Sequence, residues 1–216
     1  SIITASNKET SMKANVEHPA TERSRVLRRM ALLQEITLSI DSAATRDDII
    51  KILRTEIQYV LPNQVCFLCT LNTLRTHYIV TSLTPVADAT ELNCKHFRID
   101  EGMPGWVIKN QAAIIDGVES GPVFSYAIEG KLQDLGIESL LIVPLRTVNG
   151  VMGSLVFGSV KEGVYTEDDQ TVAQQFAMVL ASALKNTSIV EDARKRIAQI
   201  ELINNVSNTL TSIINL

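Results

Sequence analysis

The sequence predicts an α+β domain, and three observations support that fold class. Apolar residues recur every three or four positions before residue 61 but alternate after residue 63, which indicates helices followed by strands. Asn149-Gly150 separates two further alternating runs and is a strong signal for a β-hairpin. Helical spacing returns after Thr166. This order predicts an antiparallel sheet with helices on one face and a layer of loops and a short helix on the other.

Two amphipathic helices are expected at the start of the domain. The first covers residues 22–40, and its apolar stripe consists of Val26, Met30, Leu33, Ile36 and Ile40. The second covers residues 46–60 and ends before the Leu-Pro-Asn segment at 61–63. Residues 1–21 are polar and lack periodicity, so they are expected to form a disordered lead-in.

The middle of the chain is expected to hold the strands, in ranges 64–71, 76–83, 95–99, 138–147 and 151–160. The first two form a hairpin, and so do the last two. Between the hairpins, residues 101–118 begin with a glycine-containing turn and a short helix, and a loop with Gly121, Pro122 and Gly130 follows. Thr166 is the expected N-cap of a long helix that continues past Asn186, because three acidic residues occupy its first turn.

Composition and charge exclude several classes of function. The formal net charge is −4 with acids and bases interspersed, so no basic surface for nucleic acid is expected. No apolar run approaches the roughly 18 residues that cross a bilayer, so no membrane contact is expected within the chain. Three cysteines without a secretory signal indicate a reducing, cytoplasmic location. Cys66 and Cys69 fall on one strand with opposite orientations and are expected to be buried structural residues.

No motif in the sequence is spaced for catalysis or for metal binding. Gly102 and Gly105 match neither the dinucleotide-binding nor the phosphate-binding glycine loop. His18, His77 and His96 are scattered, with no cluster of cysteines or carboxylates near them in sequence. The chain is therefore expected to be non-catalytic and to hold no cofactor.

Taken together, the segments resemble the GAF sensory domains of signalling proteins, in the order in which that family has them. They are ALLQEITLSI, VCFLCTLNTLRTHYIV, GMPGWVIKNQAAIIDGV, GIESLLIVPL followed by NGVMGSLVFGS, and YTEDDQTVAQQFAMVLASALKN. The resemblance covers about residues 30–186. It implies a PAS-related fold in which the turn and short helix at 102–110 close a small-molecule pocket over the sheet.

The resemblance also implies a function. It is that of a non-catalytic, small-molecule-sensing regulatory domain in a cytoplasmic protein such as a sensor histidine kinase, with an output domain in the same polypeptide. The N-K-x-F-D motif of the cyclic-nucleotide-binding members is absent where it is expected. Lys95 separates Cys94 from His96, whereas bilin-binding members have an adjacent pair. Cys66 and Cys69 do not match the cysteines of the free methionine sulfoxide reductases.

Alternation along two strands divides core residues from pocket residues. The bulkier faces, expected to pack on the helices, contain Val65, Phe67, Cys69, Leu155 and Phe157. The smaller or more polar faces, expected to line the pocket, contain Cys66, Leu68, Thr70, Ser154, Val156 and Gly158. The resemblance adds Trp106, Phe124, Tyr126, Leu140 and Ile142 as ligand-binding residues. Replacing Gly158 with leucine is expected to fill the pocket and leave the melting temperature near that of the native protein.

The end of the chain carries two further patterns. Residues 202–210 repeat the spacing of residues 32–40 with matching Ser and Thr positions, which indicates the first of a tandem pair of domains. The 3-4-3 spacing of a coiled-coil seam is formed by Val190, Ala193, Ile197 and Ile200. The pattern restarts in another phase at Ile203, as at a junction between helical segments. A parallel homodimer through the N- and C-terminal helices is expected.

The predicted organisation is a lead-in at 1–21, a sensory domain at 22–186 and a signalling helix at 187–216. Two other functions remain open at this point. One is a dimerisation module whose pocket is filled and takes no ligand. The other is a redox or cofactor-bearing protein that uses Cys66, Cys94 or His77.

Overall fold

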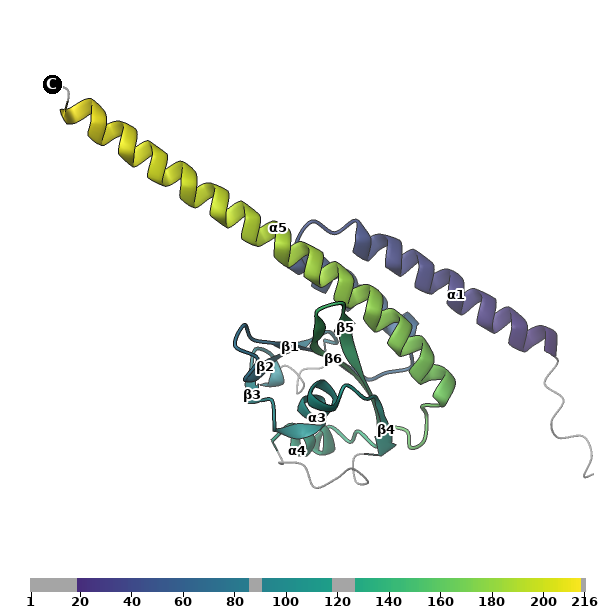
Figure 1. Cartoon of the computed structure of the whole chain (residues 1–216). Helices are drawn as coiled ribbons and strands as arrows, with labels where there is room; N and C mark the ends of the chain where they lie inside the picture. Colours follow the sequence, from purple (N-terminus) through teal and green to yellow (C-terminus); the bar gives the residue numbers. More distant parts are fainter. Residues whose placement is uncertain (1–18, 86–90, 118–126, 215–216) are drawn as a thin grey trace, which may run out of the picture.

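A computed structural model describes residues 19–85, 91–117 and 127–214. Within these ranges the strands form one six-stranded antiparallel sheet in the order β3-β2-β1-β6-β5-β4 (Figure 1). The strands are β1 (Val65–Leu71), β2 (His77–Ser82), β3 (His96–Arg98), β4 (Ile114–Gly117), β5 (Ser139–Thr147) and β6 (Gly150–Ser159). The predicted α+β class and antiparallel sheet are confirmed.

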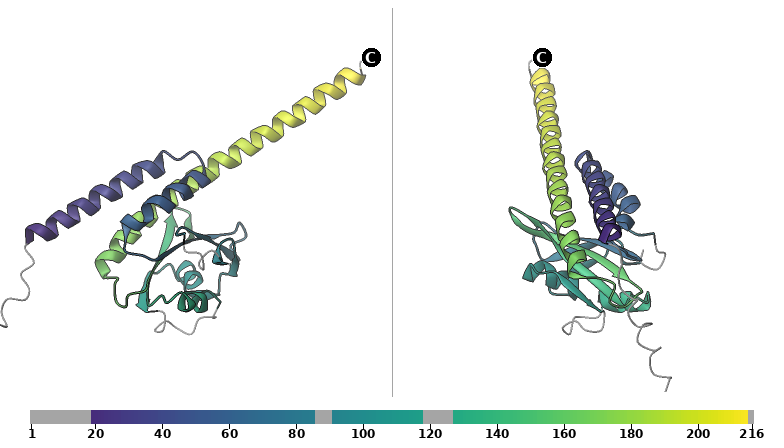
Figure 2. Two further views of the ribbon diagram at one scale, coloured as in Figure 1. Left: turned by 180° about the vertical axis from the view of Figure 1, so that it is seen from behind. Right: turned by 90° about the vertical axis from the view of Figure 1, so that its right-hand side faces the viewer.

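Helices cover both faces of the sheet. They are α1 (Pro19–Asp41), α2 (Arg46–Val60), α3 (Gly102–Asn110), α4 (Ala127–Asp134) and α5 (Glu167–Ile214). The core on one face joins residues of α1, α2 and α5, and α1 lies beside α5 (Figure 2). The short helices α3 and α4 pack on the opposite face. The sheet is therefore the middle layer between the terminal helices and the α3–α4 layer.

The predicted boundaries of α2 and α5 agree with the structure because both helices begin at a capping threonine. The Thr45 hydroxyl accepts a hydrogen bond from the Asp48 N–H at 3.2 Å. The Thr166 hydroxyl accepts one from the Asp169 N–H, also at 3.2 Å. Acidic residues in the first turn of each helix complement the helix dipole.

Two elements were not predicted. Strand β4 lies in an apolar run too short to show alternation, and α4 lies in the region expected to be a loop. Ile128 and Leu132 lie one turn apart on α4, and both are buried in the core between α4 and the sheet. The helix ends at Asp134, and Gly136 closes the turn after it: its φ of +68° allows its N–H to bond to the Gln133 carbonyl and the Ile137 N–H to bond to the Leu132 carbonyl. Nearby glycines and a proline concealed this pattern in the sequence.

Strands β1, β5 and β6 are buried on both faces, and their register decides which side chains share a face. Cα partners in neighbouring strands place their side chains on the same side of the sheet. Toward the terminal helices point Cys66, Leu68, Leu141, Val143, Leu155 and Phe157. Toward the α3–α4 layer point Val65, Phe67, Cys69, Leu140, Ile142 and Val156. Each central strand therefore contacts both helical layers.

The terminal helices differ from the prediction in detail. Helix α1 begins at Pro19, before the expected residue 22, and Met30 of its predicted apolar stripe is 61% exposed. Helix α5 is continuous through Ile214, so the change of heptad phase at Ile203 does not interrupt it. Residues 1–18 of the predicted lead-in lie outside the described residues. Among the helices that are described, none has the length and apolar character needed to cross a bilayer.

Candidate functional site

The candidate site lies between the sheet and the α3–α4 layer. On this face Phe67, Tyr78 and Val156 of the sheet pack with Met103 and Val107 of α3. All five side chains are buried. The described part of this face is thus closely packed, and a ligand here requires some of these side chains to move.

Several predicted site residues lie on this face. Leu140, Ile142 and Val156 are fully buried there. The Ser154 hydroxyl donates a hydrogen bond to the Pro104 carbonyl of α3 at 3.5 Å. Trp106 is partly buried and packs against the same core. A ligand-binding role for these residues stays a prediction, whereas their position beside α3 is an observation.

The predicted orientation of β1 is wrong. Cys66 and Leu68 belong to the core beneath the terminal helices, not to the candidate site. Thr70 is buried and accepts a hydrogen bond from the Arg46 guanidinium of α2 at 2.9 Å. The prediction assumed that bulky residues of both strands share one face. The register instead pairs small Cys66 with large Phe157, since dense packing fills space by placing small side chains beside large ones.

The expected void at Gly158 is also not present. A Cβ atom at this position would lie 2.7 Å from Val65 Cγ2 and 3.1 Å from Ile137 Cγ2. Gly158 faces the α3–α4 side, as expected, but the side chains of Val65 and Ile137 occupy the space beside it. Phe124 and Tyr126, the remaining predicted residues, lie outside the described residues.

The start of α3 brings together polar groups that the sequence did not single out. Gly102 begins the helix with a φ of +71°, a backbone conformation that glycine adopts without strain. The Tyr78 hydroxyl donates a hydrogen bond to the Glu101 carbonyl at 2.9 Å. Burial raises the pKa of Tyr78 far above its usual value, so the hydroxyl keeps its proton. The start of α3 is thereby fixed to β2.

Glu129 of α4 faces the same point. It is only 6% exposed, and its Oε1 accepts a hydrogen bond from the Met103 N–H of α3 at 2.5 Å. Its other carboxylate oxygen, Oε2, is buried and has no hydrogen-bond partner. Burial raises the pKa of Glu129, and the bond from Met103 opposes that shift. The glutamate therefore joins α4 to α3 through one carboxylate oxygen, and its other oxygen has no hydrogen-bond partner.

A sequence signal for Glu129 existed but was weak. Ile128, Leu132 and Leu135 follow four- and three-residue steps, which place Glu129 beside the apolar face of a short helix. An acidic residue inside a buried helical stripe is unusual and is a reason to expect a specific partner. The preceding glycine and proline led to the prediction of a loop instead.

The cysteines on β1 are unlike reactive thiols. Cys66 and Cys69 are fully buried, on opposite faces of the sheet. Burial raises the pKa of the Cys66 thiol, and it raises the pKa of Cys69 to about 12. The thiolate that redox chemistry requires is therefore disfavoured at both positions. Within the part of the chain that the structure describes, no three His, Cys, Asp or Glu side chains are grouped as metal ligands.

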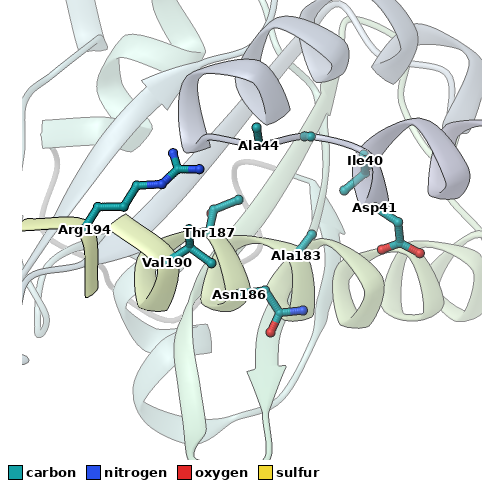
Figure 3. A pocket seen from close by; sticks show the side chains of 9 residues that line it. Ile40, Asp41, Ala44, Ala183, Asn186, Thr187, Val190 and Arg194 are labelled. Atoms are coloured by element: carbon teal, nitrogen blue, oxygen red, sulfur yellow. The ribbon is translucent and has the colours of Figure 1, made fainter. Parts of the chain in front are cut away.

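A hollow of about 210 Å³ lies on the other side of the sheet, between the α1–α2 turn and α5 (Figure 3). Small side chains such as Ala44 and Ala183 line it, and Asp41 and Arg194 lie at its two ends. Its one buried polar side chain is Thr187, whose hydroxyl already donates to the Leu184 carbonyl at 3.1 Å. The hollow therefore has no buried polar group free to orient a ligand, and the α3–α4 face is the better candidate.

Comparisons with known proteins agree with this architecture. A family model described as GAF domain matches residues 43–185. The GAF domain of a phosphoenolpyruvate-protein phosphotransferase from Acinetobacter is similar with a TM-score of 0.63 and 17% identity, over 76% of this chain and 98% of that chain. The GAF domain of a two-component sensor histidine kinase from Bacillus halodurans has a TM-score of 0.60 and 16% identity, over 69% and 99% of the two chains.

An enzyme is also among the similar structures. The free methionine-R-sulfoxide reductase from Neisseria meningitidis, in complex with its substrate, has a TM-score of 0.62 and 13% identity, over 75% of this chain and 91% of that chain. Identities this low show a shared fold alone. A comparison with curated proteins finds no match.

Proposed function

Because this chain belongs to the GAF domain family, we propose that it is a non-catalytic sensory domain that binds a small molecule between the sheet and the α3–α4 layer. GAF domains are regulatory domains of signalling proteins, and that general role applies to this chain. The specific proposal is that the bound state changes the packing of α5 on the sheet. The host protein is proposed to be a cytoplasmic sensor, such as a histidine kinase, with an output domain in the same polypeptide.

The observation that supports transmission is the double burial of the central strands. Leu140 of β5 packs toward the α3–α4 layer, and the next residue, Leu141, packs toward α5. On β6, Val156 packs toward the α3–α4 layer and Phe157 packs toward the terminal helices. A shift of either strand therefore changes both interfaces at once. By linkage, a ligand acts through α5 only if it binds one arrangement of these layers more tightly than the other.

Hydrogen–deuterium exchange tests the proposal. Native mass spectrometry identifies any small molecule that co-purifies with the chain, and a metabolite library screened by thermal shift supplies probes if none does. A bound molecule is expected to slow exchange in α3 and to alter exchange in residues 167–187, where α5 packs on the sheet. Protection confined to α3 would show binding without transmission. If no molecule binds, the alternative of a dimerisation module with a filled pocket is favoured.

We further propose that two copies of the chain pair in parallel through α5 and α1. Beyond Thr187 the apolar residues Val190, Ile197 and Ile200 of α5 are 42%, 56% and 58% exposed, in coiled-coil spacing. In a parallel pair, Arg196 of one copy lies opposite Glu201 of the other, at positions that flank such a seam. Both side chains are exposed in the single chain.

Replacing Ile197 with glutamate is expected to raise the dissociation constant of this dimer. Two buried or nearly buried carboxylates would face each other across the seam, which is strongly unfavourable in an apolar environment. Sedimentation equilibrium measures the change. Gln199→Glu introduces the same charge away from the seam and is expected to leave association unaltered. A wild-type chain that stays monomeric at high micromolar concentration would contradict the proposal.

A further inference from the structure

Two buried side-chain oxygens among the described residues have no hydrogen-bond partner, Asn63 Oδ1 and Glu129 Oε2. Asn63 is neutral, and its amide nitrogen already donates to the Ile57 and Leu61 carbonyls at the end of α2. Glu129 is ionisable, and an unpaired buried charge is far more costly than an unpaired amide oxygen. Its open hydrogen-bonding position is therefore the stronger indication of a missing partner.

Among the described residues, none supplies a positive charge that pairs with Glu129. The described residues provide it with no ion pair, and its hydrogen-bond donors are backbone N–H groups, that of Met103 at 2.5 Å among them. Lys131, on the same helix, pairs with Glu91 at 2.7 Å. The neighbouring side chains Ile128 and Met103 are apolar and buried. In the part of the chain that the structure describes, the carboxylate thus has apolar neighbours and no counter-ion.

A second acceptor lies at the same place. The Tyr78 hydroxyl uses its proton for the Glu101 carbonyl, which leaves the oxygen free to accept. The position that a Cβ atom would take at Gly102 lies 2.7 Å from Ile128 Cγ2, 3.0 Å from Glu129 Oε1 and 3.2 Å from the Tyr78 hydroxyl. The missing side chain of Gly102 is what allows both oxygens to approach the start of α3. The Glu129 carboxylate, whose other oxygen has no partner, therefore lies near a hydroxyl oxygen that is free to accept.

We propose that Glu129 binds the primary ammonium group of a small, largely apolar amine. This inference rests on the proposed function and names the ligand class for the same site. An ammonium group has three donors and a positive charge, so it satisfies Glu129 Oε2, neutralises the carboxylate and keeps further donors for acceptors nearby such as the Tyr78 oxygen. Phosphate and carboxylate groups are repelled at this point. The apolar side chains Ile128 and Met103 favour an aliphatic or aromatic remainder.

Binding at Glu129 also links the ligand to a movement of α4. Oε2 has no exposed surface, so an ammonium group reaches it only when α4 shifts from α3. The ligand consequently binds the shifted arrangement and not the closed one, which is the differential affinity that a sensor requires. Trp106 on α3 is partly buried and is the single tryptophan of the chain. Its fluorescence reports the shift.

The test uses the full chain and pairs of probes with and without a charged ammonium group. The probes are isoamylamine and phenethylamine, each beside its uncharged N-acetyl derivative. At least one amine is expected to change Trp106 fluorescence and raise the melting temperature, whereas its N-acetyl partner does neither. This comparison needs no mutation, so it stays valid if a variant folds poorly.

Matched variants then locate the ammonium group. Glu129→Gln keeps an acceptor for Met103 but removes the charge, and it is expected to weaken binding of the active amine by about tenfold to a hundredfold. Glu138→Gln makes the same change at an exposed glutamate and is expected to leave the Kd unaltered. Equal binding of amines and N-acetyl derivatives, or equal Kd in wild type and Glu129→Gln, would overturn the inference but not the proposed sensory function. Stabilisation by metabolites that are not amines would likewise overturn the amine inference and leave the sensory function standing. If no small molecule produces a response, both the inference and the proposed sensory function are overturned.

Discussion

Replacing Gly153 with alanine is expected to lower the free energy of unfolding by about 3 kcal/mol or more, because the new methyl group meets backbone. A Cβ atom at Gly153 would lie 2.0 Å from the Cys69 carbonyl oxygen and 3.1 Å from Thr70 Cα. Neither atom can turn away as a side chain does. The pairing of Thr70 with Gly153 must open, and β1 and β6 are both in the centre of the sheet. The expected result is a much lower midpoint of urea denaturation.

Gly130→Ala is the matched control for this change. A Cβ atom at Gly130 meets nothing within 4 Å, and the residue lies inside α4. Alanine is favoured over glycine in a helix, so this variant is expected to gain roughly 0.5–1 kcal/mol. Similar stabilities for the Gly153 and Gly130 variants would show that β1 and β6 separate without cost, contrary to the packing described.

Replacing Gly158 with leucine is likewise expected to destabilise the domain by about 3 kcal/mol or more. The sequence predicted the opposite, a nearly native melting temperature. The first added atom already comes within 2.7 Å of Val65 Cγ2 and 3.1 Å of Ile137 Cγ2, and Leu140 Cδ2 lies at 3.4 Å. The remaining atoms of leucine have no free volume among these neighbours. Thermal and urea denaturation both measure the loss.

A compensating substitution identifies the contact responsible. Val65→Ala removes the methyl group that lies nearest to position 158, so the double variant is expected to be more stable than Gly158→Leu alone, although Val65→Ala alone is destabilising. Gly158→Ala is expected to have an intermediate effect. Native-like stability of Gly158→Leu would mean that this face holds unfilled space, in favour of the pocket first predicted there.

The parts of the fold that local chemistry determines were predictable from sequence. The capping threonines Thr45 and Thr166 and the turn at Asn149-Gly150 act within a few residues, so they mark boundaries without knowledge of the tertiary structure. The side of the sheet on which each β1 side chain lies was not predictable in this way. Its residues are buried on both sides, and the side on which Cys66 or Phe67 points follows from pairing with β6. Side-chain size alone predicted the wrong side of the sheet for these residues.

The candidate site was predictable only in outline. The resemblance placed it beside α3, and Leu140, Ile142 and Ser154 are found there. Glu129 was missed because nothing in its local sequence shows that its carboxylate reaches the Met103 N–H, far away along the chain. Burial without a partner is a property of the folded molecule. Such residues are found by asking which buried polar atoms remain unsatisfied.

The length of α5 has a mechanical consequence. After Thr187, the last buried residue described on this helix, α5 continues for about 40 Å to Ile214 at a rise of about 1.5 Å per residue. A tilt of about 5° at the sheet would then move the far end by about 3.5 Å, a large fraction of the 8–10 Å that separates packed helix axes. The helix acts as a lever, so a displacement too small to disrupt the core at Phe157 becomes large enough to separate the helices of the proposed coiled coil.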